Sequence, residues 1–320
     1  MTVFSREAWI LILNVNKKQN GMTVLDILRS ELGLSRGMIK HLKFLEGGIT
    51  LNGESVNVRR VVSEGDILSL MTEDRKESGI LPVELPLPIL YEDGDVVVPD
   101  KPPFMPTHPS HDHYDDTVAN ALAFRYSDAD EPYVFRPVNR LDRNTSGLLI
   151  IARNRIAAGR LYESMLKKDI EKKYIAVLDG IPSEECGVID TYMRRTAESI
   201  IVREVCGECE GADRAITKYT VLRKSGTHSV VLAEPVTGRT HQLRVHFASI
   251  GCPIVGDDLY GNPSRLISRH ALHAFSIEFP HPKDHSPIRL EAPIPEDMAE
   301  LINILFPKEV QIDEKGSFKY

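Results

Sequence analysis

Hydrophobic and polar positions near the amino terminus alternate with a helical period. Apolar residues recur at helical spacing over 24–32, directly after Thr23, and Asp26 stands where a capping box places its acidic partner. Ser35 is suited to cap a second helix, with apolar positions over 39–45. The pattern therefore predicts two short helices.

The next segment changes to the two-residue period of a strand. Residues 49–58 alternate around Asn52-Gly53, the strongest short-range signature of a hairpin. Residues 61–70 add another turn and strand. We predict a small unit of two helices and a hairpin.

From residue 89 onward the pattern predicts strands and helices in irregular order. Without a regular strand–helix–strand repeat, it predicts an α+β fold with a mixed, largely antiparallel sheet and helices against it. The predicted strands are 134–141, 147–154, 173–180, 215–222, 228–236 and 271–279, and the predicted helices are 155–168 and 241–251.

Three prolines within 79–90 interrupt both patterns and predict a stiff linker. A chain of 320 residues is long enough for about two domains. The expected organisation is a small module at 1–75, a proline-rich linker at 76–88, a large domain at 89–307 and a charged tail at 308–320.

Composition narrows the class of protein. With 42% hydrophobic and 27% charged residues the chain is of ordinary globular type. No stretch approaches the ~18 apolar residues of a membrane span, so no membrane partner is expected. The first residues show no cleavage site of a secretion signal. Four cysteines without a disulfide framework fit a reducing compartment, so we expect a cytoplasmic protein.

The net charge of −7 argues at first against a nucleic-acid partner. The charges are unevenly distributed, however. Residues 136–174 hold ten Lys and Arg against four Asp and Glu, and residues 29–60 hold six against three. Because screening limits each charge to roughly 10 Å, a basic groove for phosphates is compatible with an acidic chain.

Five basic residues, Arg29, Arg36, Lys40, His41 and Lys43, cluster on and between the two predicted helices. One interpretation is a solvated helix face, and the other is an RNA-binding surface. The layout resembles the small RNA-binding module named after a small-subunit ribosomal protein, which favours the second. The matching steps are Ser35-Arg36, Asn52-Gly53 and Gly65-Asp66.

Asp142 is the first residue with a pattern that suggests chemistry. It lies between Arg140 and Arg143, in a polar turn that precedes an apolar run over 148–151. A carboxylate beside cations stays ionised, and an ionised carboxylate can act as a nucleophile or base. The alternative is an aspartate that only shapes its loop through hydrogen bonds to the backbone.

A second segment, 233–261, contains a helix that Thr240 is suited to cap and Gly251 to end. Arg244 lies about 100° from Leu243, at the flank of the apolar face. This position suits either a surface arginine or a cation directed at an active carboxylate.

Tyr174 opens a predicted strand after Lys172 and Lys173. A tyrosine on a strand commonly packs in the core or against a neighbouring strand. The other interpretation is a ring on which a base stacks.

Taken together, these segments resemble the RluA-type pseudouridine synthases over about residues 89–306. The strings that carry the resemblance are RLDRNTSGLLIIARN, KKYIAVLDG, TGRTHQLRVHFASIG with GDDLYG, ALHAFSIEFPHP, and an opening motif with Lys101-Pro102 and His108-Pro109. The chain departs from the family pattern at Asn139, where His is frequent, and at Pro103, where Gly is usual.

The resemblance implies a role for each matching residue. Asp142 matches the catalytic aspartate, and Arg140 the arginine that fills the space left by a flipped base. Tyr174 matches the active-site tyrosine, and Arg244 the cation that pairs with the aspartate. The implied activity is isomerisation of specific uridines in structured RNA without a cofactor. The family serves both ribosomal and transfer RNA, and of the two we expect ribosomal RNA. We expect RNA as the partner and a monomer with no obligatory protein partner.

Two rival functions stay open at this point. The histidines and aspartates of 108–116 would allow a metal-dependent enzyme, although their spacing fits no metal motif. The lone pair Cys206 and Cys209 predicts a surface hairpin, and His241 and His246 are predicted to be structural. The other rival is a non-catalytic RNA-binding protein.

Overall fold

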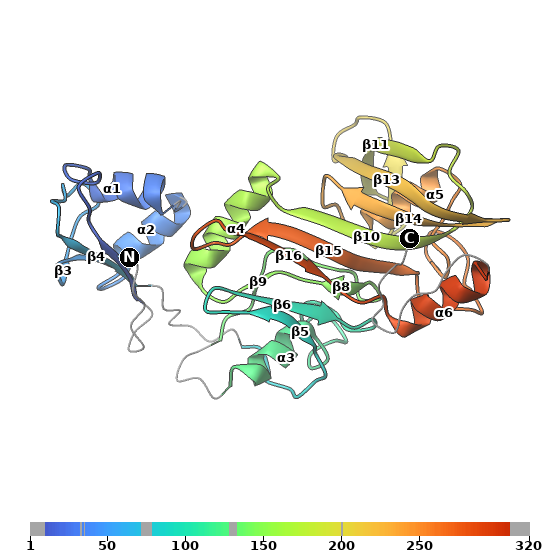
Figure 1. Ribbon diagram of the computed structural model, residues 1–320, viewed down its shortest axis with the longest axis horizontal. Coiled ribbons are helices and arrows are strands. Elements are labelled where there is room, and N and C mark those ends of the chain that lie inside the picture. The colour runs from blue at the N-terminus through green and yellow to red at the C-terminus, as the bar shows by residue number, and fades with distance from the viewer. Residues whose placement is uncertain are drawn as a thin grey trace.

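A computed structural model describes residues 10–32, 34, 36–71, 79–127, 133–199 and 201–307. A small amino-terminal module lies at one end of the molecule, beside a larger domain built on one sheet (Figure 1). No helix in the described ranges has the length and apolar character needed to cross a membrane.

The module packs two helical segments against a four-stranded antiparallel sheet with the strand order β1-β4-β2-β3. Its strands are β1 (Ile10–Asn14), β2 (Ile49–Leu51), β3 (Glu54–Ser55) and β4 (Ile67–Met71). Its helical elements are α1 (Val24–Asp26), which continues as the π-helix η1 (Ile27–Glu31), and α2 (Arg36–Phe44).

Local chemistry explains most of this module. The capping box is confirmed, because the side chains of Thr23 and Asp26 each accept a hydrogen bond from the other residue's backbone N–H. Asn52 and Gly53 have φ of 53° and 86°, the left-handed geometry of a tight hairpin turn. The predicted cap Ser35 lies outside the described residues, and the prediction missed strand β1, which pairs with β4.

The larger domain contains a twelve-stranded sheet, and β8 and β15 form its one parallel pair among the described strands. The predicted α+β class with a mixed, largely antiparallel sheet is confirmed. Its strands are β5 (Ile89–Glu92), β6 (Val96–Lys101), β7 (Arg136–Pro137), β8 (Ser146–Leu148), β9 (Ile151–Ala152), β10 (Glu171–Asp179), β11 (Cys186–Arg195), β12 (Arg203–Cys206), β13 (Asp213–Ser225), β14 (His228–Pro235), β15 (Leu272–Pro280) and β16 (Pro287–Glu291).

Four helices complete the larger domain: α3 (Val118–Arg125), α4 (Arg155–Lys167), α5 (Gln242–Ser249) and α6 (Glu296–Leu305). The predicted strand 147–154 is divided into β8 and β9, and 134–141 is reduced to β7. Gly147 has φ of 108°, and a Cβ there would lie 2.3 Å from the carbonyl oxygen of Ala274 on β15. This position therefore needs glycine if β8 is to lie against β15.

The predicted linker is only partly separate from the larger domain. Residues 79–88 form no helix or strand, as its prolines predict. Ile80, Leu85 and Leu87 nevertheless pack against the core of the larger domain, and the Val83 N–H donates to the carbonyl of Asn120 in α3. The second half of the linker is thus held on the domain surface.

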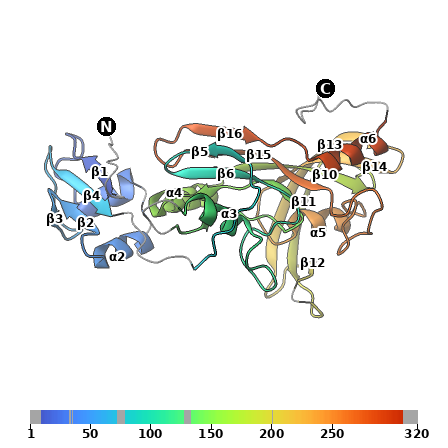
Figure 2. The same cartoon turned by 90° about the horizontal axis from the view of Figure 1, so that it is seen from below.

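The module contacts the larger domain through helix α4, beside which it lies in both ribbon views (Figures 1 and 2). The side chain of Ile156 packs in the module's hydrophobic core. The guanidinium of Arg160 donates to the carbonyl of Leu32 in the module at 2.9 Å and to that of Pro282 after β15 at 2.5 Å. These contacts join the module to the larger domain.

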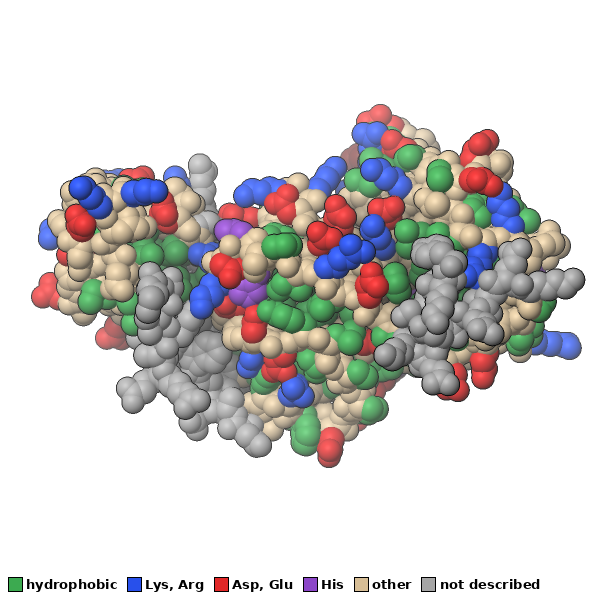
Figure 3. All heavy atoms as spheres, in the orientation of Figure 1, with side chains coloured by type: hydrophobic (Ala, Val, Ile, Leu, Met, Phe, Trp, Pro, Cys, Tyr) green, Lys and Arg blue, Asp and Glu red, His purple; other side chains and the backbone are tan. Residues whose placement is uncertain are grey.

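The surface charge is mixed. On the face drawn in Figure 3, lysine and arginine side chains lie among acidic ones over both the module and the larger domain. The basic side chains of the described residues therefore form no single continuous positive patch on this face (Figure 3).

Candidate active site

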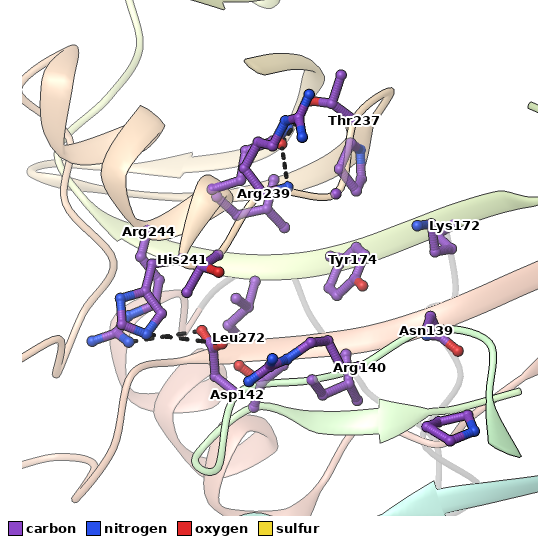
Figure 4. A pocket seen from close by; sticks show the side chains of 18 of the residues that line it. Asn139, Arg140, Asp142, Lys172, Tyr174, Thr237, Arg239, His241, Arg244 and Leu272 are labelled. Atoms are coloured by element: carbon purple, nitrogen blue, oxygen red, sulfur yellow. Dashed lines mark hydrogen bonds and ion pairs between the residues drawn. The ribbon is translucent and has the colours of Figure 1, made fainter. Parts of the chain in front are cut away.

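A cavity of about 330 Å³ opens where three segments of the larger domain meet. The loop from β7 to β8 forms one wall, strand β10 forms the floor, and the loop from β14 into α5 forms the other wall (Figure 4). The segments that carry the family resemblance are far apart in the chain, and the sheet brings them together at this cavity. Its lining includes Asp142, Tyr174, Arg244 and Arg140, together with Lys172, His241, His108 and Met165.

Asp142 lies in a loop that several buried groups hold in place. The ammonium of Lys101, which has no exposed surface, donates to the carbonyls of Pro102, Met105 and Arg143 at 2.9–3.0 Å. Burial, together with the nearby charge of Arg269, lowers the pKa of Lys101 to about 7. Lys101 thus connects the loop after β6 to the loop that carries Asp142.

Two more side chains support the same loop from the other side. Arg269 is 1% exposed, forms a double ion pair with Asp297 at 2.6 and 2.8 Å, and donates to the carbonyl of Asn144. Thr145 and His270 share a hydrogen bond of 2.8 Å between Oγ1 and Nε2. Since burial lowers the pKa of His270 to about 3, its ring is neutral near neutral pH. The loop is therefore rigidly supported close to Asp142.

The charged partner of Asp142 comes from α5 and not from the neighbouring arginines. The Nη1 atom of Arg244 lies 3.7 Å from Oδ2 of Asp142 (Figure 4). The sequence suggested Arg140 and Arg143 as the cations, but Arg143 donates to the carbonyl of Phe104, and Arg140 is exposed. The Asp142 side chain is 23% exposed, so it remains open to the cavity.

Arg244 is buried, not exposed on a helix flank, and Asp257 holds it there. Its Nε and Nη2 atoms each donate to one carboxylate oxygen of Asp257 at 2.7 Å, and its guanidinium lies over the Tyr260 ring at 5.0 Å. Burial alone would lower the pKa of Arg244, but the Asp257 hydrogen bonds raise it. The cation is thus fixed before any substrate binds.

Tyr174 projects from β10 into the same cavity and is 8% exposed. Burial, with a smaller contribution from the charge of Asp142, raises the pKa of its phenol well above the ordinary value. The ring is therefore a neutral, largely apolar surface that faces the carboxylate. Arg140 lies on the exposed side of the cavity, and Lys172 lines it from β10.

His241 is a lining residue that the sequence reasoning treated as structural. Its Nε2 atom lies 3.9 Å from Oδ1 of Asp142, and its Nδ1 atom lies 2.8 Å from the hydroxyl of Tyr260. The prediction that Thr240 caps this helix is wrong, because the N-cap of α5 is His241, with φ of 57° and no side-chain cap hydrogen bond. A left-handed backbone at a residue other than glycine, next to a carboxylate, is a sign of a functional position. This sign appears only in the folded structure and not in the sequence.

Three other predictions concern residues outside this cavity. His246 is structural as expected, since its ring contacts the hydroxyls of Thr217 and Thr191. Gly251, with φ of 75°, follows the end of α5. Cys206 ends the edge strand β12, and the exposed Cys209 lies in the loop that crosses from β12 to β13. The pair is at the surface as predicted, but this loop is not a hairpin turn, because β12 and β13 lie on opposite sides of β11.

The histidine and aspartate cluster at 108–116 does not converge. His111 pairs with Asp112 and His113 with Asp116, whereas His108 packs edge-on against Phe135. Across the residues that the structure describes, no three His, Cys, Asp or Glu side chains come together as metal ligands would. The metal-dependent rival therefore has no geometric support.

Four of the five basic residues that the sequence analysis names in the module lie on α2, Arg29 lies on η1, and none of the five lines this cavity. Lys40 and Lys43 are exposed, and the Lys43 ammonium lies 5.8 Å from the ring centre of the exposed Phe44. Arg36 begins α2, but its side chain is outside the described residues.

Comparison with known proteins agrees along most of the chain. The family model described as RNA pseudouridylate synthase matches residues 95–249. The model described as the RluD ribosomal pseudouridine synthase N-terminal domain matches residues 11–68. The first match includes the cavity, and the second match covers most of the small module.

Individual proteins show the same likeness. An uncharacterized RNA pseudouridine synthase of Bacillus subtilis, YjbO, is 35% identical over 273 residues, which cover 85% of this chain and 95% of the relative. Ribosomal large subunit pseudouridine synthase D of Xanthomonas campestris is 34% identical and covers 81% of each chain. The structure of human RNA Pseudouridylate Synthase Domain Containing 1 superposes with a TM-score of 0.56 at 30% identity, covering 67% of this chain and 86% of that one.

Proposed function

The chain belongs to the RNA pseudouridylate synthase family, whose members isomerise uridine to pseudouridine in RNA, and we propose that Asp142 is its catalytic carboxylate. One observation carries this proposal. Asp142 is the carboxylate that a supported loop presents to the cavity, opposite a buried cation and a neutral phenol.

The reaction detaches uracil from its ribose, rotates it and rejoins it through a ring carbon. No group is gained or lost, and a single ionised carboxylate suffices to act at the sugar as nucleophile or base. Arg244 stabilises negative charge beside Asp142, because the double hydrogen bond to Asp257 fixes its guanidinium. Tyr174 covers the detached base and keeps it in the cavity.

A uridine within a stack is reached only after it is flipped out, at a cost of a few kcal/mol. Arg140 is exposed on the cavity lining, two residues before Asp142, and is therefore placed to fill the space that the base leaves. We propose that Lys172, on the same lining, binds a phosphate of the flipped nucleotide.

We assign RNA affinity and target choice to the module, through Arg36, Lys40 and Lys43 on α2. The chain divides functionally into this module at 1–75, a linker at 76–88, a catalytic domain at 89–307 and a tail at 308–320. The module resembles a domain named for a ribosomal pseudouridine synthase, and several relatives are named as enzymes of the large ribosomal subunit. Ribosomal RNA is accordingly the proposed substrate, and the cytoplasm the proposed location.

We also propose that the enzyme acts as a monomer. The loop that carries Asp142 and the groups that support it, Lys101 and Arg269, belong to the same domain, so the proposed chemistry needs no residue from a second copy.

The test replaces Asp142 with asparagine, which keeps the size of the side chain and removes its charge. We expect single-turnover tritium release from uridine-labelled ribosomal RNA to fall by about a thousandfold or more, with RNA affinity unchanged. Asp258→Asn, at an exposed aspartate near Asp257, is the matched control. Asp142→Asn with more than a tenth of the normal rate would refute the assignment.

The substrate is identified separately. Carbodiimide mapping of pseudouridines in total RNA, from a deletion strain and its parent, should show a site missing from large-subunit ribosomal RNA in the deletion strain. A site missing only from transfer RNA would contradict the proposed substrate.

A further inference from the structure

His241 contacts two different partners through its two ring nitrogens. Its Nδ1 atom lies 2.8 Å from the Tyr260 hydroxyl, and its Nε2 atom lies 3.9 Å from Oδ1 of Asp142. Its side chain is 12% exposed and its backbone is left-handed, with φ of 57°. Such a backbone is uncommon for a residue with a side chain, so the surrounding structure must hold it.

The position of the imidazole proton follows from the hydrogen bonds of Tyr260. The Tyr260 hydroxyl accepts the backbone N–H of Arg203 at 2.9 Å. Its own proton is then available for Nδ1 of His241, which becomes the acceptor. When Tyr260 donates to Nδ1 in this way, the proton of the neutral ring lies on Nε2, the atom that faces Asp142.

We infer that His241 is a positioning residue that Tyr260 holds as the Nε2–H tautomer, so that a neutral N–H faces one oxygen of Asp142 while Arg244 faces the other. This inference rests on the proposed role of Asp142. The two groups lie near different oxygens of the carboxylate, Oδ1 at 3.9 Å and Oδ2 at 3.7 Å, and so both influence its orientation.

The neutrality of His241 matters for the reactivity of Asp142. Burial lowers the pKa of His241, and the charges of Arg244 and Arg203 act in the same direction, whereas Asp142 and Asp257 oppose it. A second cation would stabilise the carboxylate further and weaken it as a nucleophile or base. A neutral N–H orients the carboxylate with a smaller loss of reactivity.

Two substitutions separate this role from simple packing. His241→Asn tolerates the left-handed backbone and keeps an acceptor for Tyr260, but it lacks the distal N–H. His241→Gln carries an amide N–H at the distal position. We expect the single-turnover rate constant to fall about tenfold in His241→Asn and to stay within about threefold of normal in His241→Gln. His285→Asn is the matched control, because exposed His285 has nearly the same backbone, with φ of 61°.

The tautomer itself is measured by nitrogen-15 NMR of the imidazole rings in the full-length protein. The normal enzyme should show His241 with its proton on Nε2. Tyr260→Phe keeps the ring and removes the hydroxyl that donates to the unprotonated Nδ1 of His241. The pKa of His241 should therefore rise, and the pH–rate profile should change below pH 7. Tyr162→Phe, at an exposed tyrosine of α4, is the control.

The outcomes distinguish this inference from the proposed function. A proton on Nδ1, a charged ring at neutral pH, or a normal rate in His241→Asn would overturn the role of His241 while Asp142→Asn remains inactive. Activity in Asp142→Asn would overturn the catalytic assignment itself, and this inference with it.

Discussion

Arg244 offers the sharpest test of the site, because one guanidinium serves two carboxylates. It forms a double hydrogen bond with buried Asp257 and lies 3.7 Å from Asp142. Arg244→Met would leave the Asp257 charge buried without a partner, which costs about 3–5 kcal/mol of folding stability. The single variant therefore mixes a folding defect with a catalytic one.

A second substitution separates the two effects. Adding Asp257→Asn removes the buried charge but keeps the oxygen that accepts the backbone N–H groups of Leu259 and Tyr260. We expect Arg244→Met/Asp257→Asn to recover about 2 kcal/mol or more of the lost stability. Asp142 would still lack its cation, so the catalytic defect should persist.

The catalytic loss can be estimated from the geometry. Two unit charges 3.7 Å apart at an effective dielectric constant of about 20 interact by about 4.5 kcal/mol. Solvent reaches Asp142, which is 23% exposed, so about 2 kcal/mol is a reasonable effective value. We take the same value for the interaction of Arg244 with the negative charge that develops on the departing uracil, because only an interaction gained in the transition state changes the rate. Its loss corresponds to about a 30-fold lower rate constant in both variants.

Urea unfolding measures the stability of each variant, and single-turnover tritium release at saturating RNA measures the rate. RNA affinity should change little, because Arg244 is 4% exposed. If the double variant recovered its rate together with its stability, Arg244 would act only through the fold, and the electrostatic reasoning would be refuted.

Two further predictions concern RNA binding and acid stability. Lys40→Glu/Lys43→Glu should weaken RNA affinity about tenfold and flatten its dependence on salt, which filter binding measures, whereas the exposed pair Lys17→Glu/Lys18→Glu should change both much less. Burial lowers the pKa of His246 to about 4, so the unfolded chain takes up its proton first as the pH falls. This difference in pKa contributes about 3 kcal/mol to the free energy of unfolding above pH 6.5, and the contribution is lost as the pH falls towards 4. Urea unfolding of a fully folded His246→Gln variant should show a flatter dependence of stability on pH.

Sequence patterns predicted the parts of the fold that local chemistry determines. The capping box at Thr23 and the hairpin at Asn52-Gly53 are examples, because each depends on neighbours within a few residues. Helix α3 was missed because its residues 118–123 are all buried, which leaves no amphipathic stripe to detect. Helix α6 was missed although Glu296 and Asp297 mark its first turn.

The site was predictable by resemblance but not by local pattern. Asp142 and Arg244 are far apart in the chain, and the family strings placed them together. The partners that fix them were not predicted. Asp257 belongs to a loop after α5, and Lys101 bonds carbonyls of two separate loops, so only the folded chain shows these contacts.

The contact of the module with α4 has a consequence for how a uridine is selected. Because Ile156 and Arg160 join the module to the catalytic domain, the span between helix α2 and the cavity is fixed. An RNA that contacts both α2 and the cavity must therefore hold its target nucleotide at this fixed distance from the part of the RNA that the module binds. Selection among uridines of similar local sequence then becomes a matter of distance within the folded RNA, and Arg160→Ala would broaden the set of sites modified while leaving the chemistry at each one intact.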